Sequence, residues 1–166
     1  PSVPKGQGVI LIKGEIQLKK VPLEEARQFW QMQRLAFSEL LERYQDTQTN
    51  PACETLERVR SKMAQPGSFF YWIKWGEEPV GGIRIVAREN ESKRISPLFV
   101  LPEYRNRGMA QQAIRLAEEL YGGENWELDT IQQEKGNCHL YEKAGYRPTG
   151  ETREINHKMT LIYYKK

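Results

Sequence analysis

The first third of the chain changes from a β-type pattern to apolar residues at helical spacing. Over residues 9–21, short apolar runs interrupted by lysine and glutamine predict one or two β segments. Over residues 23–44, apolar side chains recur every three to four positions, which predicts one long or broken helix. Asn50 and Pro51 have the residue types of an N-cap and a first helical turn, so a second helix is expected from there to Pro66.

The middle of the chain carries three runs of strand-forming residues: 69–75, 80–87 and 94–101. The turns between them are short and contain glycine, proline and asparagine. Because short connections join antiparallel neighbours, these runs predict an antiparallel meander.

An amphipathic helix is expected over residues 108–121, ending at two glycines. Its apolar stripe is predicted to contain Met109, Ala113, Leu116 and Leu120. Residues 126–131 then read as a strand. A helix separates this strand from the meander, so it is expected to lie parallel to the last meander strand and beside it.

A short helix is predicted over 136–144, with Gly145 just after its end, followed by strands over about 146–151 and 155–164. The order β, α, α, β, β, β, α, β, α, β, β indicates an α/β fold with a mixed sheet and helices on its faces. We expect one domain over residues 1–166, with a disordered or processed end over its first few residues.

The composition is that of an ordinary globular protein: 28% of the 166 residues are charged and 39% are hydrophobic. A net charge of +3 suits a small polyanion but is too weak and dispersed to indicate nucleic-acid binding. Cys53 and Cys138 are far apart and predict no disulfide framework. No apolar run reaches the length of a membrane span, and a cytoplasmic location with no membrane partner is expected.

Residues 95–110 carry the strongest chemical signal. An apolar strand is followed by a turn, by Arg105 and Arg107, and by Gly108 at the start of the amphipathic helix. The start of a helix presents unpaired backbone N–H groups and the positive end of the helix dipole. This segment therefore predicts an anion site, and the natural anion is a phosphate or pyrophosphate.

Two motifs make the chain resemble a known family. Arg105-Asn-Arg-Gly108-Met-Ala110 is similar to the Arg/Gln-x-x-Gly-x-Gly/Ala signature of the GNAT N-acetyltransferases. Leu140-Tyr-Glu-Lys-Ala-Gly-Tyr146 resembles the second motif of that family, one helix and one strand further along. The resemblance implies a mixed, mostly antiparallel sheet whose central parallel strand pair is splayed at a bulge, flanked by about four helices. Pro97 fits the bulge, since proline removes a ladder donor.

The resemblance also implies a co-substrate, acetyl-CoA. Its pyrophosphate would meet the backbone N–H groups of about residues 107–112, with charge-assisted bonds from Arg105 and Arg107. Its pantetheine arm would pair with the main chain of the splayed strand. The cofactor-binding residues implied in this way are Phe99, Val100, Leu101, Arg105, Arg107, Gly108, Met109, Ala110, Gln111, Gln112, Asn137 and Tyr141.

Tyr141 is the residue that the resemblance places as general acid, protonating the departing thiolate after a primary amine attacks the thioester. A backbone N–H near Val100 would stabilise the oxyanion. The general base stays open, and Asp129, in mid-strand beside the cleft, is the first candidate. The other candidates for the base are Glu103, Glu134, Glu89, Glu91 and an ordered water.

One position departs from the family pattern. Members often have an asparagine seven residues before the tyrosine, where this chain has Glu134. Asn137 falls four residues before Tyr141 instead, where it would either cap the short helix or touch the cofactor.

Other chemistries are weaker hypotheses. Cys138 and His139 are adjacent on a helix and point about 100° apart, so they form no Cys–His pair. The histidines have no metal-ligand spacing, and no metal is expected. Two rival functions remain: a non-catalytic acyl-CoA-binding sensor or interaction module, and a domain that binds nucleic-acid phosphates. The acceptor is expected on the opposite side of the cleft from the cofactor, lined by the first two helices and the final strand pair. Its identity stays open among small amines, amino acids, antibiotics and peptide or protein amines, and a homodimer is one expected assembly.

Overall fold

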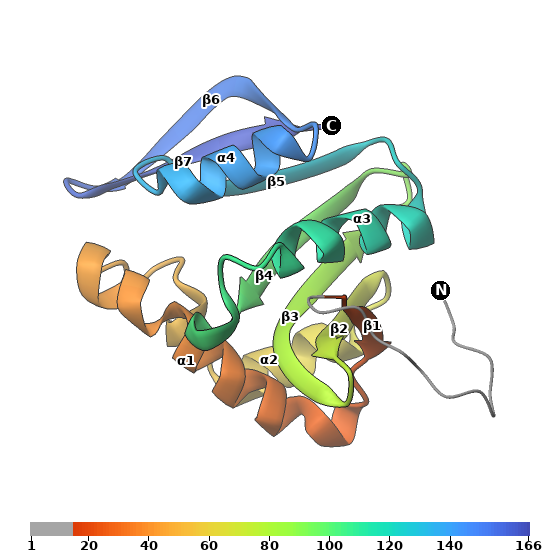
Figure 1. The fold of residues 1–166 in the computed structure, drawn as a ribbon. Helices are drawn as coiled ribbons and strands as arrows, with labels where there is room; N and C mark the ends of the chain where they lie inside the picture. The colour runs from red at the N-terminus through yellow and green to blue at the C-terminus, as the bar shows by residue number, and fades with distance from the viewer. Residues whose placement is uncertain (1–14) are drawn as a thin grey trace.

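The computed structural model describes residues 15–166, in which one seven-stranded sheet carries helices on both faces (Figure 1). The strands are β1 (Gln17–Lys20), β2 (Ser68–Trp75), β3 (Glu78–Ala87), β4 (Lys93–Val100), β5 (Trp126–Ile131), β6 (Arg147–Asn156) and β7 (Met159–Lys165). The helices are α1 (Ala26–Tyr44), α2 (Leu56–Ala64), α3 (Met109–Tyr121) and α4 (Lys135–Lys143), with short 3₁₀ turns η1 (Leu23–Glu25), η2 (Pro51–Cys53) and η3 (Pro102–Tyr104). The strand order is β1-β2-β3-β4-β5-β7-β6.

This arrangement confirms the predicted fold class. Strands β2, β3 and β4 form the antiparallel meander, and β5 lies parallel to β4 after the α3 crossover. The expected β segment is present as β1, although its predicted part over 9–14 and the expected end over the first few residues lie outside the described residues. No helix within residues 15–166 is long and apolar enough to cross a membrane.

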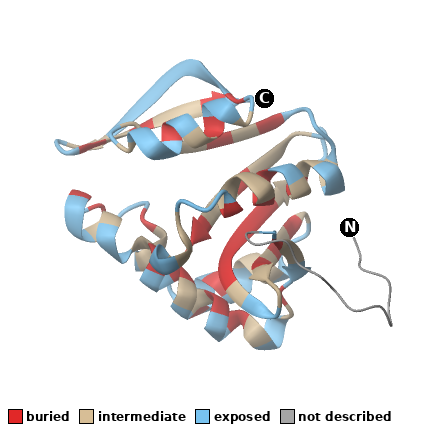
Figure 2. Cartoon of the chain, in the orientation of Figure 1, coloured by how far each residue is buried: buried red, intermediate tan, exposed pale blue. Residues whose placement is uncertain are grey.

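Two apolar clusters hold the helices on opposite faces of the sheet. The cluster under α1 and α2 contains Val21, Phe29, Ala36, Val59, Phe70, Trp72 and Phe99. The larger cluster under α3 and α4 includes Ile83, Ile95, Val100, Met109, Ile114, Trp126, Leu128, Tyr141, Tyr146 and Tyr164. Figure 2 shows the buried residues running along β3, whereas the edge strand β6 is exposed along most of its length. Because successive side chains of a strand point to opposite faces, Phe99 of β4 packs in the cluster under α1 and α2 and Val100 in the cluster under α3 and α4.

The second helix differs from the prediction at its start. The Asn50 side chain accepts from the N–H of Ala52 and caps the 3₁₀ turn η2, not a continuous helix. Helix α2 begins only after Thr55, whose hydroxyl oxygen accepts from the N–H of Arg58. Two N-capping side chains in succession divide the segment, because each offers the backbone a local alternative to a continuous helix.

The stripe of α3 and the last hairpin also differ in detail. Ala113 of the predicted stripe is buried and Leu116 is half-buried, but Leu120 in the last turn is 58% exposed, beside the exposed residues 122–125. Strand β6 continues through residues 152–154, where a turn was expected. The turn comes at Asn156, whose side-chain oxygen accepts from the N–H of Lys158.

The two central strands diverge soon after they start. The β4–β5 ladder pairs only Lys93 with Trp126 and Arg94 with Glu127. Further along, the register between β3 and β4 shifts at the segment that contains Pro97, as a bulge requires. The ribbons of β4 and β5 accordingly separate toward their carboxyl ends (Figure 1).

Candidate active site

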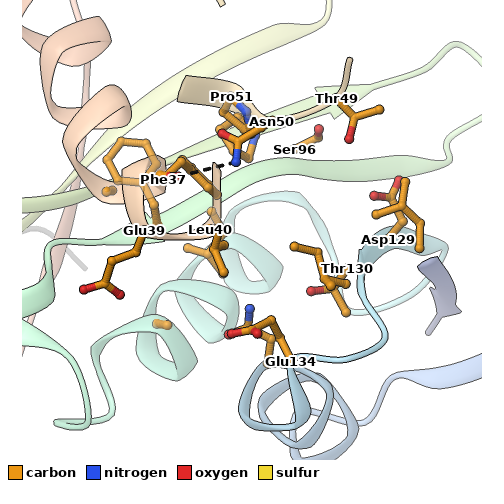
Figure 3. Close-up of a pocket in the computed structure, with 18 of the residues that line it drawn as sticks. Phe37, Glu39, Leu40, Thr49, Asn50, Pro51, Ser96, Asp129, Thr130 and Glu134 are labelled. Carbon is orange, nitrogen blue, oxygen red and sulfur yellow. Dashed lines mark hydrogen bonds between the residues drawn. The ribbon is translucent and has the colours of Figure 1, made fainter. Parts of the chain in front are cut away.

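A cavity of about 400 Å³ lies where β4 and β5 diverge. Its walls come from α1, the loop before η2, β4, the first turn of α3, β5, α4 and β7 (Figure 3). The lining residues from the sheet and α4 include Ser96, Pro97, Phe99, Val100, Asp129, Thr130, Glu134, Asn137 and Tyr141. The cavity therefore brings the two sequence motifs together with the predicted acid and base.

The free edge of β4 supplies the first functional group. The N–H of Leu101 donates to the carbonyl of Val80 at 2.8 Å, on the β3 side. Because N–H groups alternate between the two edges of a strand, the N–H of Val100 points toward β5 and the cavity. Among the three residues expected to present their main chain, Val100 is the one placed to do so. Leu101 is not, because β3 takes its donor.

Arg105 makes hydrogen bonds to two backbone carbonyls of this chain. Its Nε donates to the carbonyl of Val100 at 2.9 Å, and its Nη2 donates to the carbonyl of Ala36 in α1 at 2.8 Å. Its Nη1 also lies 3.8 Å from the carboxylate of Glu39. The guanidinium thus joins α1 to the end of β4 and occupies the Val100 carbonyl, which leaves the N–H of Val100 as the available group of that residue.

The start of α3 has the geometry of an anion site. Gly108 is the N-cap and has a φ of 76°, and a Cβ built on it would meet nothing within 4 Å. The N–H of Gln112 makes the first helical bond, to the carbonyl of Gly108, so the N–H groups of residues 109–111 precede the hydrogen-bonded ladder. Ala110 lines the cavity directly.

The remaining side chains of this segment have structural contacts. Met109 is buried in the core under α3, and Gln111 is half-buried outside the cavity lining. The side-chain oxygen of Gln112 accepts from the N–H of Ile16 at 3.2 Å. Arg107 is exposed, and its guanidinium carbon lies 5.7 Å from the centroid of the Trp75 ring. Of the two motif arginines, Arg107 is the one that remains at the surface.

Tyr141 lines the cavity from α4. It is 8% exposed, and its ring centroid lies 6.1 Å from that of Tyr146 and 6.3 Å from that of Tyr164. Within residues 15–166, no group forms a hydrogen bond with its hydroxyl. Burial, followed by the nearby charge of Asp129, raises the pKa of this phenol above its usual value. The hydroxyl therefore keeps its proton at neutral pH.

Asp129 lines the cavity from β5 and is paired. Its carboxylate accepts a hydrogen bond from the guanidinium of Arg94 on β4, across the start of the divergence. Both side chains are 23% exposed, so the pair is only partly shielded from water. This ion pair bridges the two halves of the sheet next to the cavity.

Glu134 makes a second bridge at the other end of the cavity. Its carboxylate accepts from Nη1 of Arg43 at 2.8 and 2.9 Å and from the hydroxyl of Tyr44. The two donors end α1, and Glu134 precedes α4, so this cluster ties the first helix to the second motif. Glu134 is the N-cap residue of α4, and Asn137 lies inside the helix. Asn137 is therefore not the cap, and it lines the cavity.

Replacing Tyr44 by phenylalanine is expected to lower the free energy of unfolding by about 1–2 kcal/mol, because a hydrogen bond from a buried phenol to a charged carboxylate is lost. Urea unfolding measures this loss. Tyr163→Phe is the matched control, since the Tyr163 hydroxyl has no hydrogen-bond partner in the part of the chain that the structure describes. Equal stabilities of the two variants would show that the Tyr44–Glu134 bond contributes nothing.

The wall formed by α1 and the loop before η2 belongs to the side of the cavity on which the acceptor is expected, whereas no residue of α2 lines the cavity. It contains Phe37 and Leu40 from α1 and Asn50 from the loop (Figure 3). Asp46 of the same loop also lines the cavity. Asp46 is buried, and its carboxylate accepts from the N–H groups of Gln48 and Thr49 at 3.0 Å. An aspartate whose carboxylate binds backbone N–H groups two and three residues later is typical of a turn. Asp46 is therefore the residue of this loop whose structural role the sequence could indicate.

The structure reduces the set of candidate bases. Glu103, Glu89 and Glu91 lie in exposed turns and are absent from the cavity lining, whereas Asp129 and Glu134 belong to it. Cys138 is a buried residue of α4, and its neighbour His139 is exposed. Within residues 15–166, no three His, Cys, Asp or Glu side chains gather as metal ligands would.

Known proteins share this sequence pattern and fold. An uncharacterized N-acetyltransferase in the pepI 3′ region of Lactobacillus delbrueckii subsp. lactis is 23% identical over 112 residues, which are 63% of this chain and 64% of that protein. The chain thus matches less than two thirds of the length of this curated relative.

Two solved structures have the same fold. An acetyltransferase from Thermus thermophilus superposes with a TM-score of 0.68 at 20% identity, covering 91% of this chain and 96% of that one. The spermidine N-acetyltransferase of Vibrio cholerae, in complex with CoA and spermine, gives 0.71 at 13% identity, covering 90% and 93%. A sequence profile of the acetyltransferase (GNAT) family matches residues 27–146. Since this match extends over well more than half of the chain, the protein belongs to the acetyltransferase (GNAT) family.

Proposed function

We propose that the protein is an N-acetyltransferase that uses acetyl-CoA to acetylate a primary amine by direct attack. The observation that carries this proposal is the cavity at the β4–β5 divergence. Ala110, in the first turn of the helix that Gly108 starts, lines this cavity, and so does Tyr141 of α4. An anion site, a free strand edge and a phenol are thereby arranged along one path, as a long thioester carrier requires.

The start of α3 is the proposed site of the pyrophosphate. Its N–H groups and helix dipole favour an anion, and the absence of a Cβ at Gly108 leaves room for one. We assign the added positive charge to Arg107, because its guanidinium is exposed and makes a long hydrogen bond, to the Glu103 carbonyl at 3.3 Å, whereas Arg105 donates to the carbonyls of both Val100 and Ala36. Arg105 has a positioning role in this proposal, because it fixes the end of β4.

The edge of β4 that faces β5 is the proposed site of the pantetheine arm. The β4–β5 ladder stops at Arg94, so the segment 95–100 has backbone groups on this edge that β5 does not pair. An arm with amide groups can pair with such an edge as an added strand does. The thioester would then lie near the N–H of Val100, which would stabilise the oxyanion.

Tyr141 is the proposed general acid. Acetyl-CoA supplies an activated carbonyl carbon. The amine nitrogen forms a bond to this carbon, the carbonyl oxygen takes up the negative charge, and the carbon–sulfur bond then breaks. Burial keeps the Tyr141 phenol protonated, and the phenol transfers its proton to the sulfur. The amine loses a proton to a base or to water. A proton from solvent then returns to the Tyr141 phenolate and regenerates the phenol.

Asp129 is the proposed base, and Glu134 is the alternative. The charge of Asp129 acts on the hydroxyl of Tyr141, and both residues line the cavity, which supports Asp129 as the base. Both carboxylates are paired with arginines, Asp129 with Arg94 and Glu134 with Arg43. A water molecule bound to one of them would serve as the acceptor of the proton without breaking these pairs.

The same pairing favours a second candidate function, a non-catalytic acyl-CoA-binding module. Two carboxylates held by guanidinium groups are less available as bases than a free one. In this alternative the cavity would bind the thioester, and no amine would release the thiol. A homodimer remains a further expectation for either function.

Two measurements test the proposal. Calorimetry with acetyl-CoA, CoA and ATP at two salt concentrations should show a preference for the two pantetheine-bearing ligands at both concentrations. A thiol-release screen across small amines, amino acids, aminoglycosides and peptide amines should then find at least one acceptor. Tight binding without thiol release from any acceptor would favour the non-catalytic module. Binding that falls steeply with salt and does not distinguish CoA from ATP would favour a general phosphate-binding surface.

A further inference from the structure

Arg84 on β3 is a buried cation outside both sequence motifs. It is 9% exposed, and within residues 15–166 it forms no ion pair with a carboxylate. Burial lowers the pKa of its guanidinium, and the charge of Glu54 acts in the opposite direction. A buried guanidinium loses its hydration, which costs free energy of folding. A well-packed apolar side chain at the same position would often make the folded protein equally stable. The contacts of Arg84 therefore need a reason other than stability.

The contacts of Arg84 connect three strands. Its Nε donates to the hydroxyl oxygen of Ser68 on β2 at 3.0 Å, and its Nη1 donates to the carbonyl of Ser96 on β4 at 3.2 Å. Its guanidinium carbon lies 5.7 Å from the centroid of the Phe70 ring. The planar fork of an arginine can satisfy two such acceptors at fixed positions, which a lysine does less well.

The register places Arg84 opposite the bulge of β4. Ile83 pairs with Leu98, and Ile85 pairs with Ile95. Arg84 is thus the single β3 residue that faces Ser96 and Pro97, the two residues between these pairs. A bulge leaves one residue without its ladder bond. Here the side chain of Arg84 donates to the Ser96 carbonyl at the position where the ladder is interrupted.

The bulge in turn shapes the cavity. Ser96 and Pro97 both line it, and β4 continues from them to Val100, whose N–H faces the cavity. At the other end of this segment, Arg105 holds the Val100 carbonyl. Two guanidinium groups therefore hold the carbonyls of residues 96 and 100, one from each side of the strand.

We infer that Arg84 is a positioning residue for the binding of the pantetheine arm. It fixes the bulge of β4 so that the edge from Ser96 to Val100 stays free and correctly shaped for the amides of the arm. The inference rests on the proposed function, because it assigns the arm to this edge. It predicts that Arg84 affects the arm and not the nucleotide half of the ligand, which belongs to the start of α3.

The test compares two ligands by calorimetry: acetyl-CoA, and 3′-phospho-ADP, which has the nucleotide half without the arm. Arg84→Met removes the charge and both hydrogen bonds at similar volume. We expect it to weaken acetyl-CoA binding at least tenfold and to change 3′-phospho-ADP binding less than twofold. Arg84→Lys, which keeps the charge and one donor, should restore part of the acetyl-CoA affinity. Arg58→Met is the control, since it removes an exposed arginine whose charge acts on Arg84.

Other results would overturn the inference. Equal weakening of both ligands in Arg84→Met would indicate a general structural role, and unchanged acetyl-CoA binding would remove Arg84 from the site. If Arg84→Met does not fold, Ser68→Ala and Arg84→Lys carry the same comparison, because each removes only part of the network. A wild-type protein that binds neither ligand would contradict the proposed function itself. A wild type that binds both, with variants that do not discriminate, would contradict only the inference.

Discussion

Replacement of Tyr141 by phenylalanine is expected to lower kcat for acetyl transfer by about 10² to 10⁴, the usual range for loss of a general acid. The affinity for acetyl-CoA should stay within about twofold, because the ring and its packing against Tyr146 and Tyr164 are retained. Steady-state thiol release gives kcat, and calorimetry gives the affinity. The assay uses the best acceptor from the amine screen.

Tyr146→Phe is the matched control for this variant. The Tyr146 hydroxyl is buried without a hydrogen-bond partner among the described residues, and Tyr146 is not part of the cavity lining. Its loss should leave kcat unchanged. A Tyr141→Phe enzyme that turns over as fast as the Tyr146→Phe enzyme would exclude Tyr141 from proton transfer.

The pH profile gives an independent check on the same residue. Burial raises the pKa of Tyr141 above the ordinary phenol value of about 10. The acid form is therefore fully present below pH ~10, and wild-type kcat should not fall on the alkaline side before that pH. A decline of kcat with a midpoint near pH 8 would instead point to another group as the acid.

Replacement of Gly108 by valine is expected to weaken acetyl-CoA binding by about 100-fold or more. Two physical effects combine. A Cβ enters the open space in front of the α3 start, and a β-branched residue is strained at a φ of 76°. Loss of two charge-assisted hydrogen bonds, each worth about 1.5–3 kcal/mol, accounts for this factor. Calorimetric titration with acetyl-CoA measures it.

Gly150→Val separates the strain from the binding effect. Gly150 lies on β6, has a φ of 91°, and a Cβ built on it also meets nothing within 4 Å. Both variants should lose a similar amount of unfolding free energy, on the order of 1–2 kcal/mol for a left-handed position. Only Gly108→Val should lose the ligand. Equal acetyl-CoA affinity in the two variants would show that the pyrophosphate of acetyl-CoA does not bind at the start of α3.

The prediction of the fold from the sequence worked where one local signal decided each element. Helical spacing located α1 and α3, and the helix between β4 and β5 required a parallel pair. Boundaries failed where two local signals competed, as at Asn50 and Thr55, which each cap a separate turn. They also failed in β6, where no burial contrast marks the strand.

The motifs pointed to residues that line the candidate cavity but not to all the contacts that these residues make. Arg105 illustrates the limit. Its place in the motif suggested a phosphate ligand, whereas its guanidinium binds the carbonyls of Val100 and Ala36. Ala36 lies 69 residues away in sequence, so no local pattern could reveal that contact. The contacts of Arg84 with Ser68 and Ser96 were missed for the same reason.

The sequence by itself determined the order of elements, the glycine-initiated helix after β4 and the tyrosine on α4, because periodicity, capping and turn chemistry act over a few neighbouring residues. Only the tertiary structure decided how far β4 and β5 separate, which backbone groups remain unpaired and which arginines are already engaged. These properties depend on contacts between distant segments. A side chain's hydrogen-bonding groups can be assigned to a ligand only when its partners across the fold are known.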